Sequence, residues 1–369
     1  MRLLIFSMEK MKQRIAITRF PFESQFGGEE LHTLQVAKHW REQGHEVMLF
    51  SSCPVLIDLF SEDGFKVLPF TLTKPPVTKG RLIMFTLFYK WYLFKAWQLA
   101  KAIKKAKVSR VYCLSFSEKL LLPWFLNNER YYFVEHARIG NWFYQNPWKK
   151  LYYKFAKAGQ VVTVSKMMAC DLHYPEAIVI PNGVDVAQFK RENVIRNWER
   201  PQLTTVGRLT ADKGIDVFID ALIELNQTNK NWQATIVGQG PLAPVFKTKI
   251  MGAGLQDQIE LITKLPRPQL IMLLKKTEIF CLLSPKTDPF GLVVAEAMAA
   301  GAIPLATNKC GIVDYSHLIY QVRANNSEAV VTAVKHITAD KLSVDAVQQE
   351  AADKFALNKM LDAYEQLLV

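Results

Sequence analysis

Short apolar runs rich in β-branched residues alternate with longer amphipathic runs along most of the chain. This alternation predicts parallel strands that are covered by helices, an α/β fold. In the first half, the predicted strands are residues 14–18, 46–50, 108–114, 131–135 and 161–164. In the second half, they are residues 202–206, 234–237, 259–263, 279–283 and 303–306.

Predicted helices separate the strands, and a break near the midpoint divides the chain. The clearest helices are residues 28–43, 216–229, 268–276 and 292–300, with a last one at 344–368. Pro181, Asn182 and Gly183 interrupt the rhythm, and the polar run 190–200 follows. We therefore expect one domain over 1–180, a second over 181–343, and a C-terminal helix over 344–369.

Composition and cysteine usage indicate two ordinary globular domains in a reducing compartment. The chain has 369 residues, half of them hydrophobic. Its five cysteines are scattered and form no CxxC pair, which argues against a disulfide framework and a zinc site. The apolar run at residues 3–6 is too short for a signal peptide, so we expect a cytoplasmic location.

The positive charge is concentrated in the first half of the chain. The net charge is +12, and no acidic residue occurs between Asp63 and Glu118. Two segments, 80–106 and 142–155, combine aromatic residues with lysines, and Lys90 and Lys95 argue against a membrane span. These segments are either interfacial helices on an anionic membrane or core helices with solvated lysines. No nucleic-acid motif is present, so we expect no nucleic-acid partner.

Two acids in the segment 284–306 have a spacing that suits an elongated ligand. Asp288 lies in a loop broken by proline and glycine, and Glu296 lies about one turn inside the following helix. Eight residues at 1.5 Å each cover about 12 Å, comparable with a sugar, a diphosphate and a ribose in a row. The amides at the helix start would face the phosphates. Alternatively, the acids complement the helix dipole.

Two other strand-to-helix turns carry phosphate-binding chemistry. Gly27 and Gly28 precede the first helix, and without side chains their backbone amides can approach a phosphate. The alternative is an ordinary strand-to-helix turn. Arg208 and Lys213 lie in the turn TVGRLTADKG and could neutralise a diphosphate, or simply be solvated. His136 follows a predicted strand in VEHAR and either faces a cleft at the strand end or is a satisfied core or surface residue.

These strings together resemble glycosyltransferase family 4. The resemblance rests on PFGL followed by EAMA, on G-R-L-x-x-x-K-G, on PNGVD, on VEHAR, and on GG-x-E at Gly27, Gly28 and Glu30. It covers nearly the whole chain in element order, and its specific motifs lie mostly in the second half. Members are retaining enzymes of the GT-B architecture, in which two Rossmann-like domains face each other across a cleft. Their C-terminal helix commonly crosses back to the first domain.

The resemblance implies transfer of a sugar from a nucleotide diphosphate donor without a metal or other cofactor. His136 and Asp288 would lie at the reacting centre. The implied diphosphate contacts are Gly27, Gly28, Arg208, Lys213, Leu292 and Val293. The implied sugar and ribose contacts are Asp288, Phe290, Gly291 and Glu296, and the base contacts are Gly238, Lys264 and Leu265. Asp288 stands where the family usually has Glu, and TKL at 263–265 stands where it often has a glycine.

The resemblance also implies partners and a place of action. We expect a glycan or lipid-linked acceptor, and a peripheral position at the inner face of the cytoplasmic membrane. A relative without turnover, which binds a sugar nucleotide or a membrane as a partner subunit, is the alternative.

Overall fold

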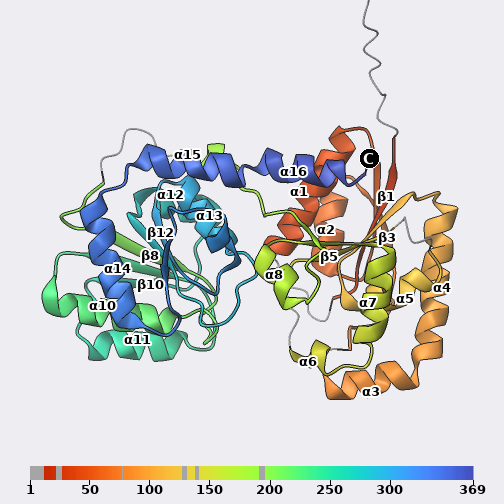
Figure 1. The fold of residues 1–369 in the computed structure, drawn as a ribbon, viewed down its shortest axis with the longest axis horizontal. Coiled ribbons are helices and arrows are strands. Elements are labelled where there is room, and N and C mark those ends of the chain that lie inside the picture. Colours follow the sequence, from red (N-terminus) through yellow and green to blue (C-terminus); the bar gives the residue numbers. More distant parts are fainter. Residues whose placement is uncertain are drawn as a thin grey trace, which may run out of the picture. The chain divides into compact units, whose positions relative to one another are not determined.

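The computed structural model describes residues 12–21, 27–76, 78–126, 131–137, 141–190 and 196–368, with nothing described for the side chains of 141 and 142. The chain forms two compact units (Figure 1). The first unit comprises Met1–Thr163, Ala169–Ile180 and Leu361–Val369, and the second comprises Val164–Met168 and Pro181–Met360. The apolar run at residues 3–6 and Arg138, the residue two positions after His136, lie outside the described residues.

Each unit is built on one sheet whose paired strands run parallel. In the first unit the order is β3-β2-β1-β4-β5-β6-β7, and in the second it is β10-β9-β8-β11-β12-β13. The strands of the first sheet are β1 (Arg14–Arg19), β2 (Glu46–Ser51), β3 (Lys66–Pro69), β4 (Arg110–Cys113), β5 (Tyr131–Glu135), β6 (Gln160–Thr163) and β7 (Ile178–Val179). Those of the second are β8 (Gln202–Val206), β9 (Gln233–Val237), β10 (Ile259–Ile262), β11 (Ile279–Leu282), β12 (Ile303–Thr307) and β13 (Tyr320–Val322).

Helices cover both faces of each sheet (Figure 1). Up to residue 180 they are α1 (Gly28–Glu42), α2 (Pro54–Glu62), α3 (Lys79–Leu87), α4 (Tyr89–Lys105), α5 (Phe116–Leu121), α6 (Asn141–Tyr144), α7 (Lys149–Ala158) and α8 (Lys166–Asp171). Beyond it they are α9 (Val186–Phe189), α10 (Ile215–Thr228), α11 (Ala243–Gly252), α12 (Arg267–Lys276), α13 (Leu292–Ala299), α14 (Ser327–Asp340), α15 (Val344–Phe355) and α16 (Leu357–Gln366). Because apolar side chains from both sheet faces are buried beneath these helices, each unit has its own core.

The strand order creates a switch point in each sheet. In the first sheet, β1 lies between β2 and β4, and in the second, β8 lies between β9 and β11. At such a point the chain leaves the central strands toward opposite sides, and the loops at their carboxyl ends separate. Ligands of open parallel sheets bind in that space, so the loops after β1, β4, β8 and β11 are the places to look for a site.

All ten predicted strands are present, with ends that shift by at most two residues, which confirms the predicted α/β class. Three strands escaped prediction: β3, β7 and β13. Their sequences are KVLP, IV and YQV, and their residues are partly exposed or very few. Such short strands at a sheet edge lack the run of apolar positions that marks a buried strand.

The predicted single helix at 344–368 is instead two helices, α15 and α16. Ala356, between them, has an extended backbone with φ −60° and ψ 135°. It pairs with Val184, whose amide donates to the Phe355 carbonyl at 2.7 Å and whose carbonyl accepts from Leu357 at 2.9 Å. These hydrogen bonds to a distant segment of the chain therefore interrupt the helix. The local sequence around Ala356 does not predict them.

The two aromatic, lysine-rich segments differ in their environments. In 142–155, Phe143 and Tyr152 are fully buried in the core of the first unit, so the core alternative holds for the described side chains of that segment. In 80–106, α3 ends and α4 begins around Phe88, and several aromatic side chains are exposed. None of the described helices has the length and apolarity that a membrane crossing requires.

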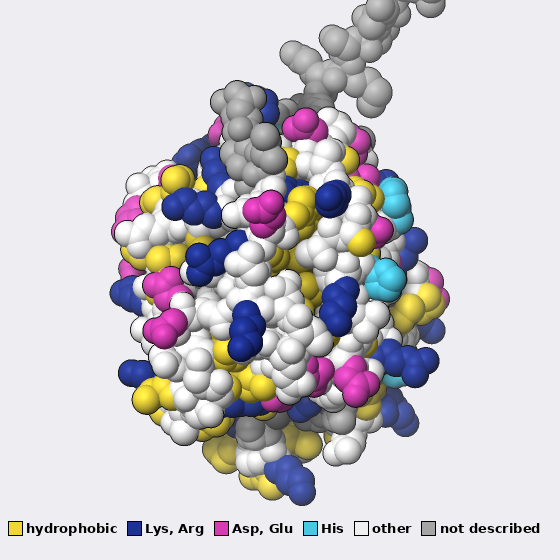
Figure 2. All heavy atoms as spheres, turned by 90° about the vertical axis from the view of Figure 1, so that its left-hand side faces the viewer, with side chains coloured by type: hydrophobic (Ala, Val, Ile, Leu, Met, Phe, Trp, Pro, Cys, Tyr) yellow, Lys and Arg dark blue, Asp and Glu magenta, His cyan; other side chains and the backbone are white. Residues whose placement is uncertain are grey.

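Charge is mixed on the side of the second unit that carries α10, α11 and α14. There, basic and acidic side chains are interspersed (Figure 2). This agrees with the sequence, in which the excess of positive charge belongs to the first half.

Candidate functional site

Lys213 and Asp288 meet at the switch point of the second sheet. Lys213 lies in the turn after β8 and Asp288 in the loop after β11, and their Nζ and Oδ2 atoms are 2.7 Å apart. The Asp288 loop is held by backbone bonds to Lys309 and Gly311 at 2.8 and 3.0 Å. Both side chains keep some exposure, 21% for Lys213 and 11% for Asp288, so a ligand can reach them.

Gly214 sets the position of Lys213. Its φ of 68° lies in the left-handed region, and an added Cβ would lie 1.9 Å from the Leu283 carbonyl oxygen. The turn after β8 can therefore pack against the end of β11 only with glycine at this position. This close approach brings Lys213 to the Asp288 loop.

Helix α13 begins directly after that loop and carries Glu296. Gly291, in the left-handed region with φ 89°, precedes its first residue Leu292. The first amides of a helix have no partner within it, so the amides of Leu292 and Val293 favour an anion at this end. Glu296, one turn further on, is buried, and its Oε1 accepts from Arg267 Nη2 at 2.7 Å. Burial raises the pKa of Glu296, and Arg267 opposes that shift.

The other predicted residues of the second unit differ in their exposure. Arg208 is exposed and bonds Asp212 at 3.1 Å. Gly238 follows β9, and Lys264 and Leu265 follow β10, which pairs with β9, so these three lie at neighbouring strand ends.

The Phe290 side chain is buried and packs on Tyr315 and Phe355, with ring centroids 6.0 and 5.9 Å away. With this ring packed in the core, the backbone of Phe290 is the part that could make the sugar contact that the resemblance implies.

The turn after β1 in the first unit carries an ion-pair cluster beside Gly27 and Gly28. Gly28 begins α1, and the next two residues, Glu29 and Glu30, face Arg19 at the end of β1. Arg19 binds Glu29 through both terminal nitrogens, at 2.9 and 3.1 Å, and lies 3.5 Å from Glu30. Burial raises the pKa of Glu29, and Arg19 opposes the shift. The described part of the predicted phosphate turn thus carries carboxylates beside the two glycines.

A buried lysine supports the end of β5, immediately before His136. Lys119 is 1% exposed, lies 2.8 Å from Glu135 Oε1, and donates to the Val134 carbonyl at 2.8 Å. Glu135 also accepts from the Tyr152 hydroxyl at 2.7 Å. Because a buried charge without a partner is costly, this set fixes the backbone from which His136 projects.

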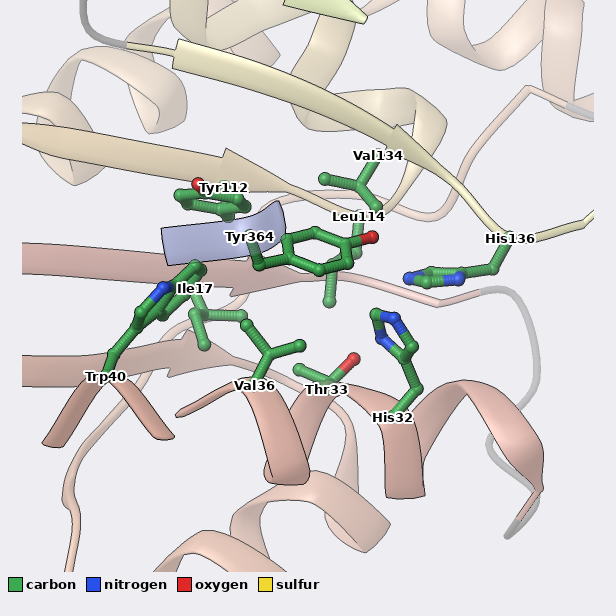
Figure 3. A pocket seen from close by; sticks show the side chains of 10 residues that line it. All are labelled: Ile17, His32, Thr33, Val36, Trp40, Tyr112, Leu114, Val134, His136 and Tyr364. Carbon is green, nitrogen blue, oxygen red and sulfur yellow. The ribbon is translucent and has the colours of Figure 1, made fainter. Parts of the chain in front are cut away.

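His136 faces a second histidine. Figure 3 shows His32, from α1, and His136, after β5, with their rings close together at one end of a small pocket, opposite Trp40. The ring centroids are 4.4 Å apart and the planes are inclined by 65°. Burial lowers the pKa of His32 to about 3. Burial, and then the neighbouring His32, lower the pKa of His136 well below its ordinary value. Both imidazoles are therefore neutral at neutral pH.

The structure brings the predicted residues together in two groups. Lys213, Asp288, Gly291 and the start of α13 lie around the switch point of the second sheet, and Gly27, Gly28 and His136 follow strands β1 and β5 of the first. Sequence reasoning missed several partners of these residues: Arg19, His32, Lys119, Arg267 and Tyr364. His32 had a usable signal, because it lies four positions before Val36 and eight before Trp40 on the buried face of α1. Arg267 had none, since its contact with Glu296 is tertiary.

Comparisons with known proteins agree with this geometry. Residues 26–188 match the family model described as Glycosyltransferase Family 4, and residues 186–354 match that of glycosyl transferases group 1. A putative colanic acid biosynthesis glycosyltransferase, WcaL, of Salmonella typhimurium is 28% identical over 53% of this chain and 52% of its own. The lipopolysaccharide core biosynthesis mannosyltransferase LpcC of Rhizobium leguminosarum bv. viciae is 26% identical over 49% and 54%.

The first curated relatives are matched over only part of their length, about half in the case of WcaL and LpcC. The likeness to solved structures covers nearly the whole chain. A glycosyltransferase from Rickettsia africae ESF-5 has a TM-score of 0.76 at 22% identity, over 97% of this chain and 99% of its own. Anabaena Alr3699/HepE, solved with UDP and glucose, has a TM-score of 0.72 at 16% identity, over 96% and 98%.

The two parallel sheets and these structural neighbours confirm the predicted GT-B fold class. The two family models together run from residue 26 to residue 354. The chain belongs to glycosyltransferase family 4 and has the GT-B fold.

Proposed function

We propose that the protein is a retaining glycosyltransferase that moves a sugar from a nucleoside diphosphate donor to a cell-envelope or lipid-linked glycan. The observation that carries this proposal is the contact between Lys213 and Asp288 beside the start of α13. Family membership supports transfer chemistry, and the relatives named for colanic acid and lipopolysaccharide core biosynthesis support an acceptor of this class.

The donor would lie along the loops at the switch point of the second sheet. Lys213 and the amides of Leu292 and Val293 would hold the diphosphate, with Arg208 joining from the same turn. Asp288, 2.7 Å from Lys213, would bind the hydroxyls of the attached sugar. A cation and a carboxylate in contact suit two neighbouring parts of one donor, because the sugar is bonded directly to the diphosphate.

Glu296 and the ends of β9 and β10 would hold the nucleoside. Arg267 engages one oxygen of the Glu296 carboxylate, and the other oxygen can accept bonds from ribose hydroxyls. Gly238, Lys264 and Leu265 would contact the base. The buried position of Glu296 strengthens such a bond, because it forms away from water.

Departure of the diphosphate is the step that develops charge. Fixed cations and helix amides stabilise this charge as it forms, and they do so without reorganisation. In the front-face reaction that we propose, the acceptor hydroxyl attacks from the side of the leaving group. A phosphate oxygen takes its proton, so the configuration at the anomeric carbon is retained. His136 would lie beside the donor sugar. We propose no metal and no other cofactor.

A membrane surface is the place of action that we propose, and an exposed stripe on α3 and α4 supports it. These helices form the edge of the first unit drawn in orange in Figure 1. Seven large apolar residues of this stripe are exposed by 44% to 71%: Ile83, Met84, Leu87, Phe88, Trp91, Phe94 and Trp97.

The stripe combines ring stacking with positive charge. Phe94 stacks with Trp97 at a centroid distance of 5.7 Å and packs at a tilt against Trp91 at 5.9 Å. Lys95 and Lys101 lie over the Trp91 and Trp97 rings at 5.4 Å. The opposite side of α4 is buried through Ala96, Leu99, Ala100 and Ile103, so the stripe is not the core face of this helix. Exposed tryptophans beside lysines suit the interface of an anionic bilayer.

The direct test is transfer from a panel of UDP-, GDP- and ADP-sugars to extracted lipid-linked acceptors, with a chelator present and absent. We expect one donor class to be used, a product with the anomeric configuration of the donor by NMR, and no effect of the chelator. Inversion at the anomeric carbon would contradict the retaining mechanism. A folded protein that binds a donor but transfers and hydrolyses none of the panel would instead support the non-catalytic partner subunit.

A further inference from the structure

A guanidinium group is held against the carboxylate of Glu296 by contacts from two sides. Arg267 is the first residue of α12, two positions after Leu265, and α12 packs against α9 and α13. Its Nη2 atom lies 2.7 Å from Oε1 of Glu296, and its Cζ atom lies 5.2 Å from the centroid of the Phe189 ring. The ring is 1% exposed and lies at the end of α9. A charged hydrogen bond and a cation–π contact therefore fix the position of the guanidinium.

The helix that carries Arg267 gives no reason for a cation at this position. The free amides in the first turn of a helix carry partial positive charge, which disfavours arginine there. Cations are favoured in the last turn, and α12 has Lys275 and Lys276 in that turn. The placement of Arg267 is therefore better explained by Glu296 than by the stability of α12.

Glu296 needs a cation because its surroundings are apolar. It lies within the sequence LVVAEAMA of α13, and most of the other residues of this helix are fully buried. Burial raises the pKa of Glu296, and the hydrogen bond and the charge of Arg267 oppose that shift. An ionised carboxylate accepts hydrogen bonds through both oxygens, whereas a protonated carboxyl also presents a donor. Arg267 therefore favours the form of Glu296 that accepts bonds from hydroxyls.

One oxygen of this carboxylate remains available to a ligand. The described residues make one hydrogen bond to the Glu296 carboxylate, the bond from Arg267 to Oε1. The Glu296 side chain keeps 8% of its surface exposed. A hydroxyl that bonds Oε2 would meet a carboxylate whose orientation is already set by Arg267, so little has to be ordered on binding.

We propose that Arg267 is a positioning residue for Glu296, and that the pair makes the protein select ribonucleotide donors over 2′-deoxyribonucleotide donors. The inference rests on the proposed function, in which Glu296 binds the ribose. A ribonucleotide offers its 2′-hydroxyl to the oriented carboxylate. A deoxyribonucleotide would exclude water from Oε2 without replacing the lost bond. A site built around a hydroxyl rejects an analogue without it for this reason, since a buried polar group is then left unpaired.

Binding of matched nucleoside diphosphates to the full chain tests the proposal. Isothermal titration calorimetry would compare UDP with dUDP, GDP with dGDP and ADP with dADP. In the parent protein we expect the ribonucleotide to be preferred over its deoxy counterpart by at least about tenfold, as for a hydrogen bond to a charged group. Arg267→Leu should weaken binding of the ribonucleotide and leave that of the deoxyribonucleotide nearly unchanged. The preference should fall by about fivefold, the difference between a charged and a neutral partner.

Further variants separate positioning from folding. Arg267→Lys keeps the charge and should retain more of the preference than Arg267→Leu does. Arg267→Gln removes the charge but keeps a polar group, and its loss of preference decides the question if Arg267→Leu fails to fold. The matched control is Lys249→Leu, which removes a partly exposed cation from an ion pair with Asp220 at 2.6 Å. We expect this control to keep the preference of the parent protein.

Steady-state kinetics with the preferred donor supply a second readout. The ribose is not part of the reacting centre, so its contacts are the same in the ground state and in the transition state. We therefore expect Arg267→Leu to raise the donor KM by about tenfold with little change in kcat. A purely structural role for Arg267 would instead lower kcat through loss of folded enzyme and leave the donor KM unchanged.

The outcomes distinguish this inference from the proposed function. Equal binding of both members of a nucleotide pair by the parent protein would overturn the inference, while sugar transfer by the same protein would leave the proposed function standing. A preference that is as large in Arg267→Leu or Arg267→Gln as in the parent, or that falls equally in Lys249→Leu, would also overturn it. A parent protein that binds no nucleoside diphosphate of the panel would overturn both.

Discussion

Lys213 and Asp288 are 75 positions apart in the sequence, yet their side chains are in contact at 2.7 Å across the carboxyl ends of β8 and β11. In the proposed function they hold adjoining parts of one donor molecule. The two residues are also each other's counter-charge while no donor is bound. Changes at either residue should therefore affect catalysis strongly and in different ways.

Replacing Lys213 with alanine should lower kcat by at least about 100-fold, as expected when one fixed donor to a developing charge is removed. Steady-state kinetics with the preferred donor would measure the loss. Lys249→Ala is the matched control, because Lys249 also forms an ion pair, with Asp220 at 2.6 Å, but lies on α11. A comparable loss of turnover in the control, or none in Lys213→Ala, would contradict the assignment.

Replacing Arg267 with leucine should destabilise the protein, because it leaves the buried Glu296 carboxylate without its partner. Breaking a buried pair costs about 3–5 kcal/mol, and we expect about 1–2 kcal/mol here because Arg267 itself is 45% exposed. Urea unfolding would measure the change in free energy. Arg267→Lys should lose less. A stability equal to that of the parent would show that Glu296 finds another partner or takes up a proton.

Acid should destabilise the first unit through His32 and His136. The pKa of His32 falls to about 3 on folding, and that of His136 also falls, so between pH 6.5 and these values the unfolded chain binds protons that the folded chain does not. Stability is therefore retained above pH 6.5 and lost as the pH falls, by up to about 1.4 kcal/mol per pH unit for each histidine.

Denaturant unfolding between pH 7 and pH 5 would measure this slope. His32→Phe should reduce it, whereas substitution of the exposed His317 should not reduce it to the same extent. A slope that is identical in the parent and in His32→Phe would show that His32 is not a source of the acid sensitivity.

Replacing Trp91 and Trp97 with serine should weaken binding to anionic vesicles, because these rings are the exposed aromatic anchors of α4. We expect at least about a tenfold loss, since each ring contributes on the order of 1 kcal/mol or more at an interface. Sedimentation with vesicles containing anionic lipid would measure it. Val245 and Met251, which are at least as exposed on α11 as the two tryptophans are on α4, give a matched double-serine control. Equal binding of all three proteins would remove the support for this surface.

The strands and the linear motifs could be predicted because their signals are local. A buried strand is marked by a run of apolar residues. Lys213, in the turn after β8, and Glu296, on α13, each lie within a short motif that can be recognised in the sequence. Arg267 and Glu296 are 29 positions apart, and their contact depends on how α12 and α13 pack. The sequence around either residue does not predict it. The same holds for Tyr364, whose neighbours come from α1 and the ends of β4 and β5.

Lys119 shows a further limit of sequence reasoning. It occurs in the apolar stretch FSEKLLLPWF, where a lysine would be expected to reach solvent. Its burial is decided by the carboxylate of Glu135 and the carbonyl of Val134, both on β5. Periodicity can therefore locate α5, but the charge that stabilises Lys119 is provided by another element.

The contact of Gly214 with the end of β11 separates two kinds of information within one short motif. Any side chain at this position would collide with the Leu283 carbonyl, whatever the protein binds. Lys213, one position earlier, is held by its ion pair with Asp288 and, in the proposed function, by the diphosphate that it binds. A descendant that lost its enzymatic activity would still need this glycine to fold, whereas its lysine could be replaced by other residues. In comparisons among relatives, the lysine is therefore the residue that reports whether turnover has been kept.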